Sequence, residues 1–155
     1  MWRPAKQLGV GDITVSPLAK RYLNQILSSG RITYGKFTKE FETTLAKIHQ
    51  VKYAVFCNSG TSALQVALHA LKQYYRWQDQ DEIIVPALTF VSTVNTVLHN
   101  RLKSVFVDVE PDYLMLDPAK IEAKITARTK AVIPVHIGGQ PADMDAIEMI
   151  ATKYK

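Results

Sequence analysis

The amino-acid sequence predicts an α/β fold in which a mainly parallel sheet is flanked by helices. After residue 50, short apolar runs rich in β-branched residues recur with little polar alternation, which is typical of strands buried on both faces of a parallel sheet. The predicted strands are Tyr53–Cys57, Glu82–Val85, Ser104–Val109 and Lys130–Val135. Segments with helical character lie between and after them: Thr61–Tyr75, Phe90–Leu98, Pro118–Ile125 and Asp143–Tyr154. This alternation of strands and helices indicates a doubly wound layer.

Two helices are expected before this layer. Ser16 can cap the first helix, Pro17 suits its first position and Gly30 lies past its end. The second helix has apolar residues at helical spacing, namely Phe37, Phe41, Leu45 and Ile48. We therefore expect an N-terminal helical segment, residues 1–50, followed by the first part of an α/β domain, residues 51–155.

The composition is that of an ordinary folded protein. Of the 155 residues, 47% are hydrophobic and 21% are charged, which is enough apolar material for one core. The net charge is +5, and the basic residues are scattered, which argues against a nucleic-acid-binding surface and would suit a small anionic ligand.

Three features of the sequence bear on the cellular location of the protein. No apolar run approaches the ~18 residues that a membrane helix needs. The stretch Met1–Lys6 lacks the apolar segment of a secretion signal. Because Cys57 is the single cysteine, no internal disulfide can form. We therefore expect a cytoplasmic protein that does not enter the membrane.

The strongest local motif is Asn-Ser-Gly-Thr-Ser-Ala-Leu at residues 58–64, between a predicted strand and a predicted helix. The start of a helix presents free N–H groups and a partial positive charge, so it can bind a phosphate. Gly60 would let the backbone approach the ligand, and Thr61 and Ser62 would add hydroxyl donors. A plain capping turn built on Ser59 or Thr61 explains the same residues equally well. The P-loop and dinucleotide-binding patterns are both absent.

Two more candidates follow the ends of predicted strands, where ligands bind in open α/β sheets. Phe90 could lie against a flat ring, and His136 could hydrogen-bond a ligand or carry a proton. Taken alone, each has a structural alternative: a core side chain for Phe90, and a capped histidine beside a glycine turn for His136. The remaining histidines, His49, His69 and His99, are expected to be structural, and their dispersal gives no metal-ligand spacing.

In their order and spacing, the motifs resemble the DegT/StrS-type nucleotide-sugar aminotransferases. From about Ser16 onward the matching segments are Ser29–Ile32, Phe37–Glu42, Ser59–Leu64, Asp81–Pro86, Thr89–Asn95, Val105–Val109, Thr129–His136 and Gly139–Asp145. The resemblance implies a partial fold type I, aspartate aminotransferase-like large domain that binds pyridoxal 5'-phosphate (PLP). It implies amino transfer, usually from glutamate, to a keto group of a nucleotide-linked sugar, as in the biosynthesis of cell-surface polysaccharides or antibiotic sugars.

The resemblance also implies roles for individual residues. Gly60, Thr61 and Ser62 would hold the PLP phosphate, Phe90 would stack on the pyridine ring, and His136 would line the same edge. Full-length members continue with an aspartate that pairs with the pyridine nitrogen and a lysine that binds the cofactor covalently. Neither segment is among the 155 residues, so no residue here is assigned a catalytic role. We expect a fragment that is inactive alone, whether an excised piece, a truncated gene product or half of a split protein.

Two other hypotheses stay open. One is a non-catalytic binding or partner module that keeps a phosphate site. The other is a fragment of a related PLP sugar dehydrase, the branch in which a histidine replaces the lysine. In each case an incomplete sheet would expose strand edges and apolar patches, so we expect a homodimer or higher homo-oligomer. Its interface should bury a sheet edge or the residues Leu23, Ile26, Phe37 and Phe41.

Overall fold

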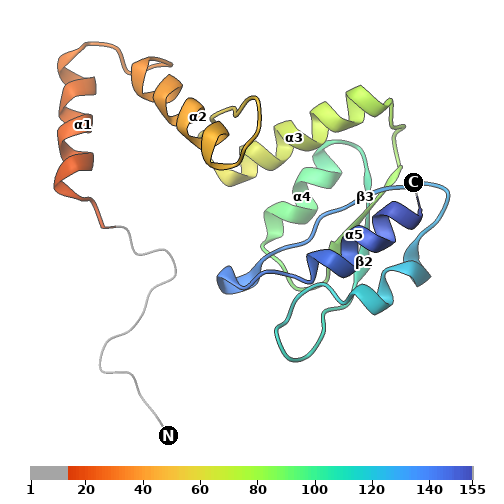
Figure 1. Ribbon diagram of the computed structural model, residues 1–155. Helices are drawn as coiled ribbons and strands as arrows, with labels where there is room; N and C mark the ends of the chain where they lie inside the picture. Colours follow the sequence, from red (N-terminus) through yellow and green to blue (C-terminus); the bar gives the residue numbers. More distant parts are fainter. Residues whose placement is uncertain (1–13, 155) are drawn as a thin grey trace, which may run out of the picture. The chain divides into compact units, whose positions relative to one another are not determined.

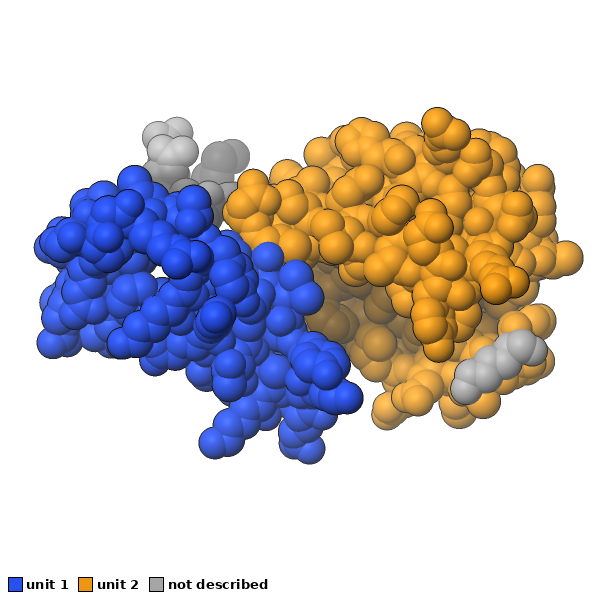
Figure 2. Space-filling view, turned by 90° about the horizontal axis from the view of Figure 1, so that it is seen from above, with its two compact units in different colours: residues 1–56 blue, residues 57–155 orange. Residues whose placement is uncertain are grey.

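The computed structural model describes residues 14–154 of a chain with two compact units, residues 1–56 and 57–155, coloured separately in Figure 2. The two units meet after Phe56, and the domain boundary expected after residue 50 stays a prediction. Residues 1–13 lie outside the described residues, and with them the Met1–Lys6 stretch in which no secretion signal is predicted.

The first unit contains both helices that the sequence predicts there. Helix α1 spans Pro17–Ser28 and helix α2 spans Lys36–Ile48 (Figure 1). Ser16 caps α1 as expected, because its hydroxyl accepts a hydrogen bond from the Ala19 amide at 3.1 Å. Glu42 on α2 then binds a later segment, since its carboxylate accepts the amide hydrogen of Phe56 at 2.9 Å.

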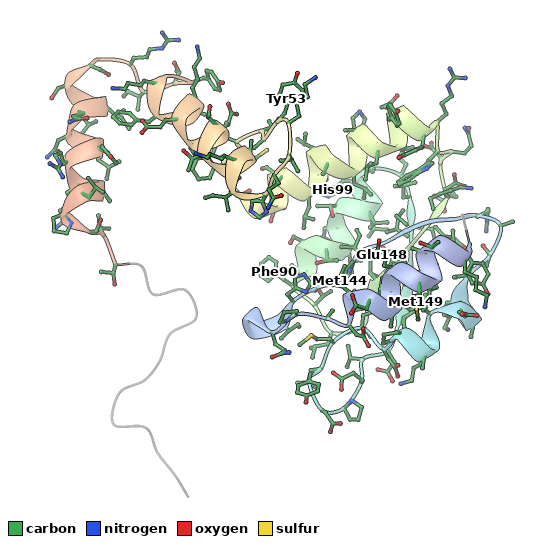
Figure 3. The ribbon with its side chains drawn as sticks, in the orientation of Figure 1. Tyr53, Phe90, His99, Met144, Glu148 and Met149 are labelled. Carbon is green, nitrogen blue, oxygen red and sulfur yellow. The ribbon has the colours of Figure 1, made fainter. Side chains whose placement is uncertain are left out.

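The predicted strand at Tyr53–Cys57 is wrong. In the described chain this segment has no strand partner, and Tyr53 and Val55 are 75% and 73% exposed. Figure 3 shows the Tyr53 side chain projecting from a loop. β-branched and aromatic residues favour a strand only where a neighbouring strand supplies the ladder and a surface to pack on. The bond between Phe56 and Glu42 supplies a side-chain acceptor in place of such a ladder.

A three-stranded parallel sheet forms the centre of the second unit, which confirms the predicted α/β class. The strands are β1 (Glu82–Pro86), β2 (Lys103–Val107) and β3 (Thr129–Val132), in the order β2-β1-β3. All five residues of β1 are buried, whereas β2 and β3 are only partly covered. Burial on both faces therefore holds for the central strand and not for the two edge strands, and the sheet has three of the four strands expected.

Helices cover both faces of this sheet. Helices α3 (Gly60–Tyr75) and α4 (Val91–His99) pack on one face, and α5 (Met144–Lys153) packs on the other (Figure 1). Successive β1 side chains point to opposite faces. One cluster therefore contains Leu68, Ile83, Val85, Val97 and Leu102. The other contains Ile84, Val107, Met115, Leu116, Ile121, Ala142 and Ile147. Burial of each large aliphatic side chain contributes about 1.5–3 kcal/mol.

The predicted helix at Pro118–Ile125 is also wrong, because the chain forms two short 3-10 turns there. They are η1 (Pro118–Lys120) and η2 (Glu122–Lys124), and a third such turn, η3, spans Ile137–Gly139. The tighter turns place Ile121 in the core, fully buried. Eight residues make little more than two α-helical turns, and isolated α-helices of that length are marginal, so the demands of packing decide the conformation.

Within residues 14–154, no helix combines the length and the apolar character that crossing a bilayer requires.

A candidate anion and ring site at the carboxyl edge of the sheet

Helices α3 and α4 both begin at the edge of the sheet where the parallel strands end. Helix α4 finishes at its cap Asn100, just before β2 starts at Lys103, so α4 runs antiparallel to β2. The side-chain amide of Asn100 contacts the Gln65 carbonyl at 3.4 Å, and Lys72 donates to the Asn100 carbonyl at 2.8 Å. The middle of α3 and the part that follows it therefore lie beside the amino edge, and the helix begins on the side of the carboxyl edge.

The first turn of α3 leaves two amides free for a ligand. Ser59 caps the helix, and its hydroxyl accepts the Ser62 amide hydrogen at 3.1 Å. The capping role proposed for Ser59 is thus confirmed. Its hydroxyl occupies the Ser62 amide, which is one hydrogen-bond donor of the predicted phosphate site. The amides of Gly60 and Thr61 have no acceptor among residues 14–154. The first turn carries no acidic residue, so the donor set suits an anion.

Gly60 faces open space. A methyl group placed on its Cα would meet no atom within 4 Å, and its φ lies outside the left-handed region that favours glycine. Neither packing nor backbone conformation within the described chain therefore requires glycine here. A group that approaches the backbone from outside would require it, and a phosphate at the helix start is such a group.

Phe90 lies at the start of α4, just after β1, and not in the core. Its side chain is 72% exposed, and Figure 3 shows it at the beginning of that helix. The loop around it is held by a 2.9 Å hydrogen bond between the hydroxyls of Thr89 and Thr93 and by a 3.0 Å bond from the Thr93 amide to the Phe90 carbonyl. Phe90 is therefore an exposed ring on an ordered loop at the carboxyl edge.

His136 lies past the end of β3, at the same edge. Its side chain is exposed, and its Nδ1 accepts the Ala142 amide hydrogen at 3.0 Å. The chain turns between these residues through Gly138 and Gly139, whose φ values of 63° and 87° favour glycine. The glycine turn proposed as the structural alternative for His136 is thus present.

The three predicted pieces of the site therefore share one edge of the sheet. The loops that carry Phe90 and His136 lie beyond the carboxyl ends of the parallel strands, and α3 begins on that side of the sheet (Figure 1). No cluster of three or more histidine, cysteine or acidic side chains able to hold a metal ion is found in the described part of the chain.

The opposite edge contains a charge network that the sequence analysis missed. The buried carboxylate of Glu82 accepts hydrogen bonds from the Thr126 hydroxyl at 2.5 Å and from Lys103 at 2.9 Å, and Arg128 lies 3.8 Å away. These bonds, the Thr126 hydroxyl first, hold the pKa of Glu82 below its ordinary value. The available signal was an acidic residue at the start of an apolar strand, with basic residues near the starts of two others.

Two contacts at the carboxyl edge were also missed. The Thr89–Thr93 hydroxyl pair and the His136–Ala142 bond both fix loops that carry predicted site residues. Thr89 stood next to Phe90 in a matched segment, which was a usable signal. The bond from the Ala142 amide to His136 left no pattern in the sequence, because this bond depends on how the glycine turn folds.

Comparison with known proteins gives this geometry a family. The model of the DegT/DnrJ/EryC1/StrS aminotransferase family matches residues 16–155. The chain belongs to this family. The family resemblance predicted from the sequence is therefore confirmed, and so is the fold class that it implied.

Individual relatives agree with this assignment. The spore coat polysaccharide biosynthesis protein SpsC of Bacillus subtilis is 42% identical over 132 residues, which is 85% of this chain and 33% of SpsC. The structure of an aminotransferase from Psychrobacter cryohalolentis matches with a TM-score of 0.83 at 33% identity, covering 90% of this chain and 35% of that one.

A relative with different chemistry matches equally well. The GDP-4-keto-6-deoxy-D-mannose-3-dehydratase of E. coli, solved with bound hydrated PLP, matches with a TM-score of 0.84 at 31% identity, covering 91% of this chain and 37% of that one. The chain spans about a third of the length of the curated relatives that it matches.

Proposed function

We propose that this chain forms the phosphate- and ring-binding part of a PLP-dependent enzyme that modifies a nucleotide-linked keto sugar. The proposed reaction is amino transfer, with glutamate as the amino donor. Family membership supports this proposal, as do structural neighbours that contain PLP or its amino form. The convergence of the predicted residues on one edge of the sheet supports it independently of the family.

Each candidate residue has a specific task in this proposal. The amides of Gly60 and Thr61 and the hydroxyls of Thr61 and Ser62 hold the phosphate, helped by the partial positive charge at the start of α3. Phe90 covers one face of the pyridine ring, and an aromatic contact of this kind contributes about 0.5–1.5 kcal/mol beyond burial. PLP, when bound, supplies an electron sink, while the protein supplies position and electrostatics.

The observation that carries the proposal is the glycine at position 60, because nothing inside the described chain requires a glycine there. The test is Gly60→Ala, with Gly35→Ala as the matched control. Gly35 is the N-cap residue of α2, and its φ also lies outside the left-handed region. A methyl group on its Cα would lie 3.6 Å from the Thr33 carbonyl oxygen, which is an ordinary contact. Absorbance titration with PLP and urea unfolding would be measured on both variants and the wild type.

We expect Gly60→Ala to keep or raise stability, by up to ~1 kcal/mol, because alanine is the better helix former. The same change should weaken PLP binding about tenfold or more, because the methyl lifts the phosphate away from charge-assisted hydrogen bonds worth roughly 1.5–3 kcal/mol. Gly35→Ala should leave PLP binding unchanged. Wild-type affinity in Gly60→Ala would show that the start of α3 is only a capped helix.

A sugar dehydratase is the second candidate, because an E. coli enzyme of that class shares this fold at a TM-score of 0.84. Reading the source gene beyond the codon for Lys155 would separate the two. A lysine at the position that binds the cofactor covalently would favour amino transfer, and a histidine would favour dehydration.

A polypeptide of these 155 residues alone should lack transaminase activity. Amino transfer by this family depends on an activated lysine and on a charged partner for the ring nitrogen, and neither is assigned within the chain. The chain would be incubated with PLP, glutamate and a keto acceptor. Amino transfer above the background of free PLP would contradict this expectation, whereas reversible PLP binding alone would not.

Assembly into a homodimer or higher homo-oligomer is part of the same proposal. Within the first unit, α1 and α2 form an apolar groove whose walls include Tyr22, Leu23, Ile26, Phe37 and Phe41. Leu23 and Phe41 are each about half exposed in the single chain (53% and 50%), so a second copy would remove apolar surface from water. Light scattering at low concentration tests this, and a stable monomer would contradict it.

We also propose a cytoplasmic location, which fits the free thiol of Cys57.

A further inference from the structure

Two hydrogen bonds hold His136, one at its backbone and one at its ring. Its carbonyl accepts the Gly139 amide hydrogen at 3.3 Å, and its Nδ1 accepts the Ala142 amide hydrogen at 3.0 Å. Ala142 is itself anchored, because it is only 4% exposed and belongs to the core cluster beneath α5. The ring is therefore tied to a rigid part of the fold, although the side chain as a whole remains exposed.

The bond to Ala142 determines which ring nitrogen carries the proton. A backbone N–H can only donate, so Nδ1 must present a lone pair, and the proton of the neutral ring must lie on Nε2. An imidazolium has a proton on both nitrogens, so it would set a donor against the Ala142 donor and break the bond. This arrangement leaves Nε2–H as the hydrogen-bond donor of the ring that is open to a ligand.

We propose that His136 is a neutral hydrogen-bond donor, locked in the Nε2–H tautomer by Ala142, that binds an oxygen or nitrogen acceptor of a ligand at the carboxyl edge of the sheet. The ligand half of this inference rests on the proposed function, whereas the tautomer lock rests on the structure of the chain alone. His136 then orients its ligand through Nε2–H.

Two substitutions separate the two nitrogens. In His136→Asn the side-chain oxygen can take the place of Nδ1 as acceptor for Ala142, but the outer donor is lost. In His136→Gln the side-chain amide can reach the position of Nε2 as donor, but the acceptor for Ala142 is lost. Hydrogen exchange of the Ala142 amide, PLP titration and circular dichroism would be measured on the full chain for both variants and the wild type.

The ring signals of His136 would be assigned as the histidine signals that disappear in His136→Asn. At neutral pH, we expect long-range ¹⁵N–¹H spectra to show that its Nε2 is protonated and its Nδ1 is not. Exchange at Ala142 should stay slow in His136→Asn and become about fivefold faster or more in His136→Gln. PLP binding should weaken about fivefold or more in His136→Asn, and less in His136→Gln.

A proton on Nδ1, or an imidazolium at neutral pH, would overturn the lock. PLP binding in His136→Asn that equals the wild type would overturn the donor role while leaving the proposed function standing. If the wild type itself does not bind PLP, the donor role and the proposed function are both wrong. The spectra and the exchange of the Ala142 amide would still test the tautomer lock.

Discussion

The two ends of the same three strands are built in opposite ways. At the amino ends, Glu82 is buried and accepts hydrogen bonds from Thr126 and Lys103, so that one carboxylate joins β1, β2 and the turn before β3. At the carboxyl ends, free helix amides, an exposed aromatic ring and an exposed imidazole face outward. At the amino edge the polar groups hydrogen-bond one another, whereas at the carboxyl edge these groups remain exposed to solvent and can contact a ligand.

We interpret this difference as a separation of stability from the proposed function within one small sheet. Polar groups that are satisfied inside the protein stabilise it, and groups left open at a binding edge contribute little until a ligand arrives. Asn100 belongs to the closed edge, because its side chain bonds the Thr96 carbonyl at 2.8 Å and His69 at 3.1 Å. Substitutions at the amino edge should therefore lower stability, and substitutions at the carboxyl edge should lower ligand affinity.

The largest effect is expected for Glu82→Gln. The variant keeps the shape of the side chain but loses the charge that Thr126 and Lys103 satisfy, at a cost of about 1–3 kcal/mol in the free energy of unfolding. Urea unfolding would measure it. Glu122→Gln is the matched control, because its carboxylate, bonded to Lys153 and Tyr154, is 43% exposed, and little change is expected. Equal effects in the two variants would erase the proposed contrast in burial.

Acid should expose the same network in the wild type. Because the pKa of Glu82 is lowered in the folded chain, its contribution is fully present above its unfolded pKa of about 4.3 and is lost as pH falls through its folded pKa. The free energy of unfolding should therefore fall less steeply below about pH 4.3 in Glu82→Gln than in the wild type. Parallel pH curves for the two proteins would rule out this role for the carboxylate.

A smaller loss of stability, about 1 kcal/mol, is expected for Asn100→Ala, which removes a buried side chain joining α4 to α3. Asn95→Ala, on the exposed face of α4, is the control and should be close to neutral. Thermal unfolding of both variants checks this. If the two variants melt together, the Asn100 bonds add nothing to the closed edge.

The smallest effect on stability belongs to the carboxyl edge. Phe90→Ala should change the free energy of unfolding by less than ~0.5 kcal/mol, because the ring is 72% exposed. PLP affinity should fall about 2- to 10-fold, which corresponds to a lost stacking contact of roughly 0.5–1.5 kcal/mol. Phe90→Tyr keeps a ring and should bind nearly as the wild type does. A Phe90→Ala variant that is destabilised but binds PLP normally would reverse the comparison.

Features set by neighbouring residues were readable from the sequence. Ser16 and Pro17 marked the start of α1, and the residues around Gly60 marked the start of α3. The central strand was also found, because all its residues are buried and therefore apolar apart from Glu82. The positions of Phe90 and His136 beyond strand ends followed from the alternation of strands and helices, since parallel strands end at a common edge.

Only the tertiary structure decided the features that join distant parts of the chain. The β-rich segment at Tyr53–Cys57 forms no strand because the described chain gives it no ladder, and Pro118–Ile125 tightens into 3-10 turns to bury Ile121. Glu82 and Thr126 are 44 residues apart in the sequence, and their bond exists because β1 and β3 are neighbours. Caps and apolar periods are local and leave a pattern in the sequence, whereas a hydrogen bond between distant residues depends on where packing brings the two atoms.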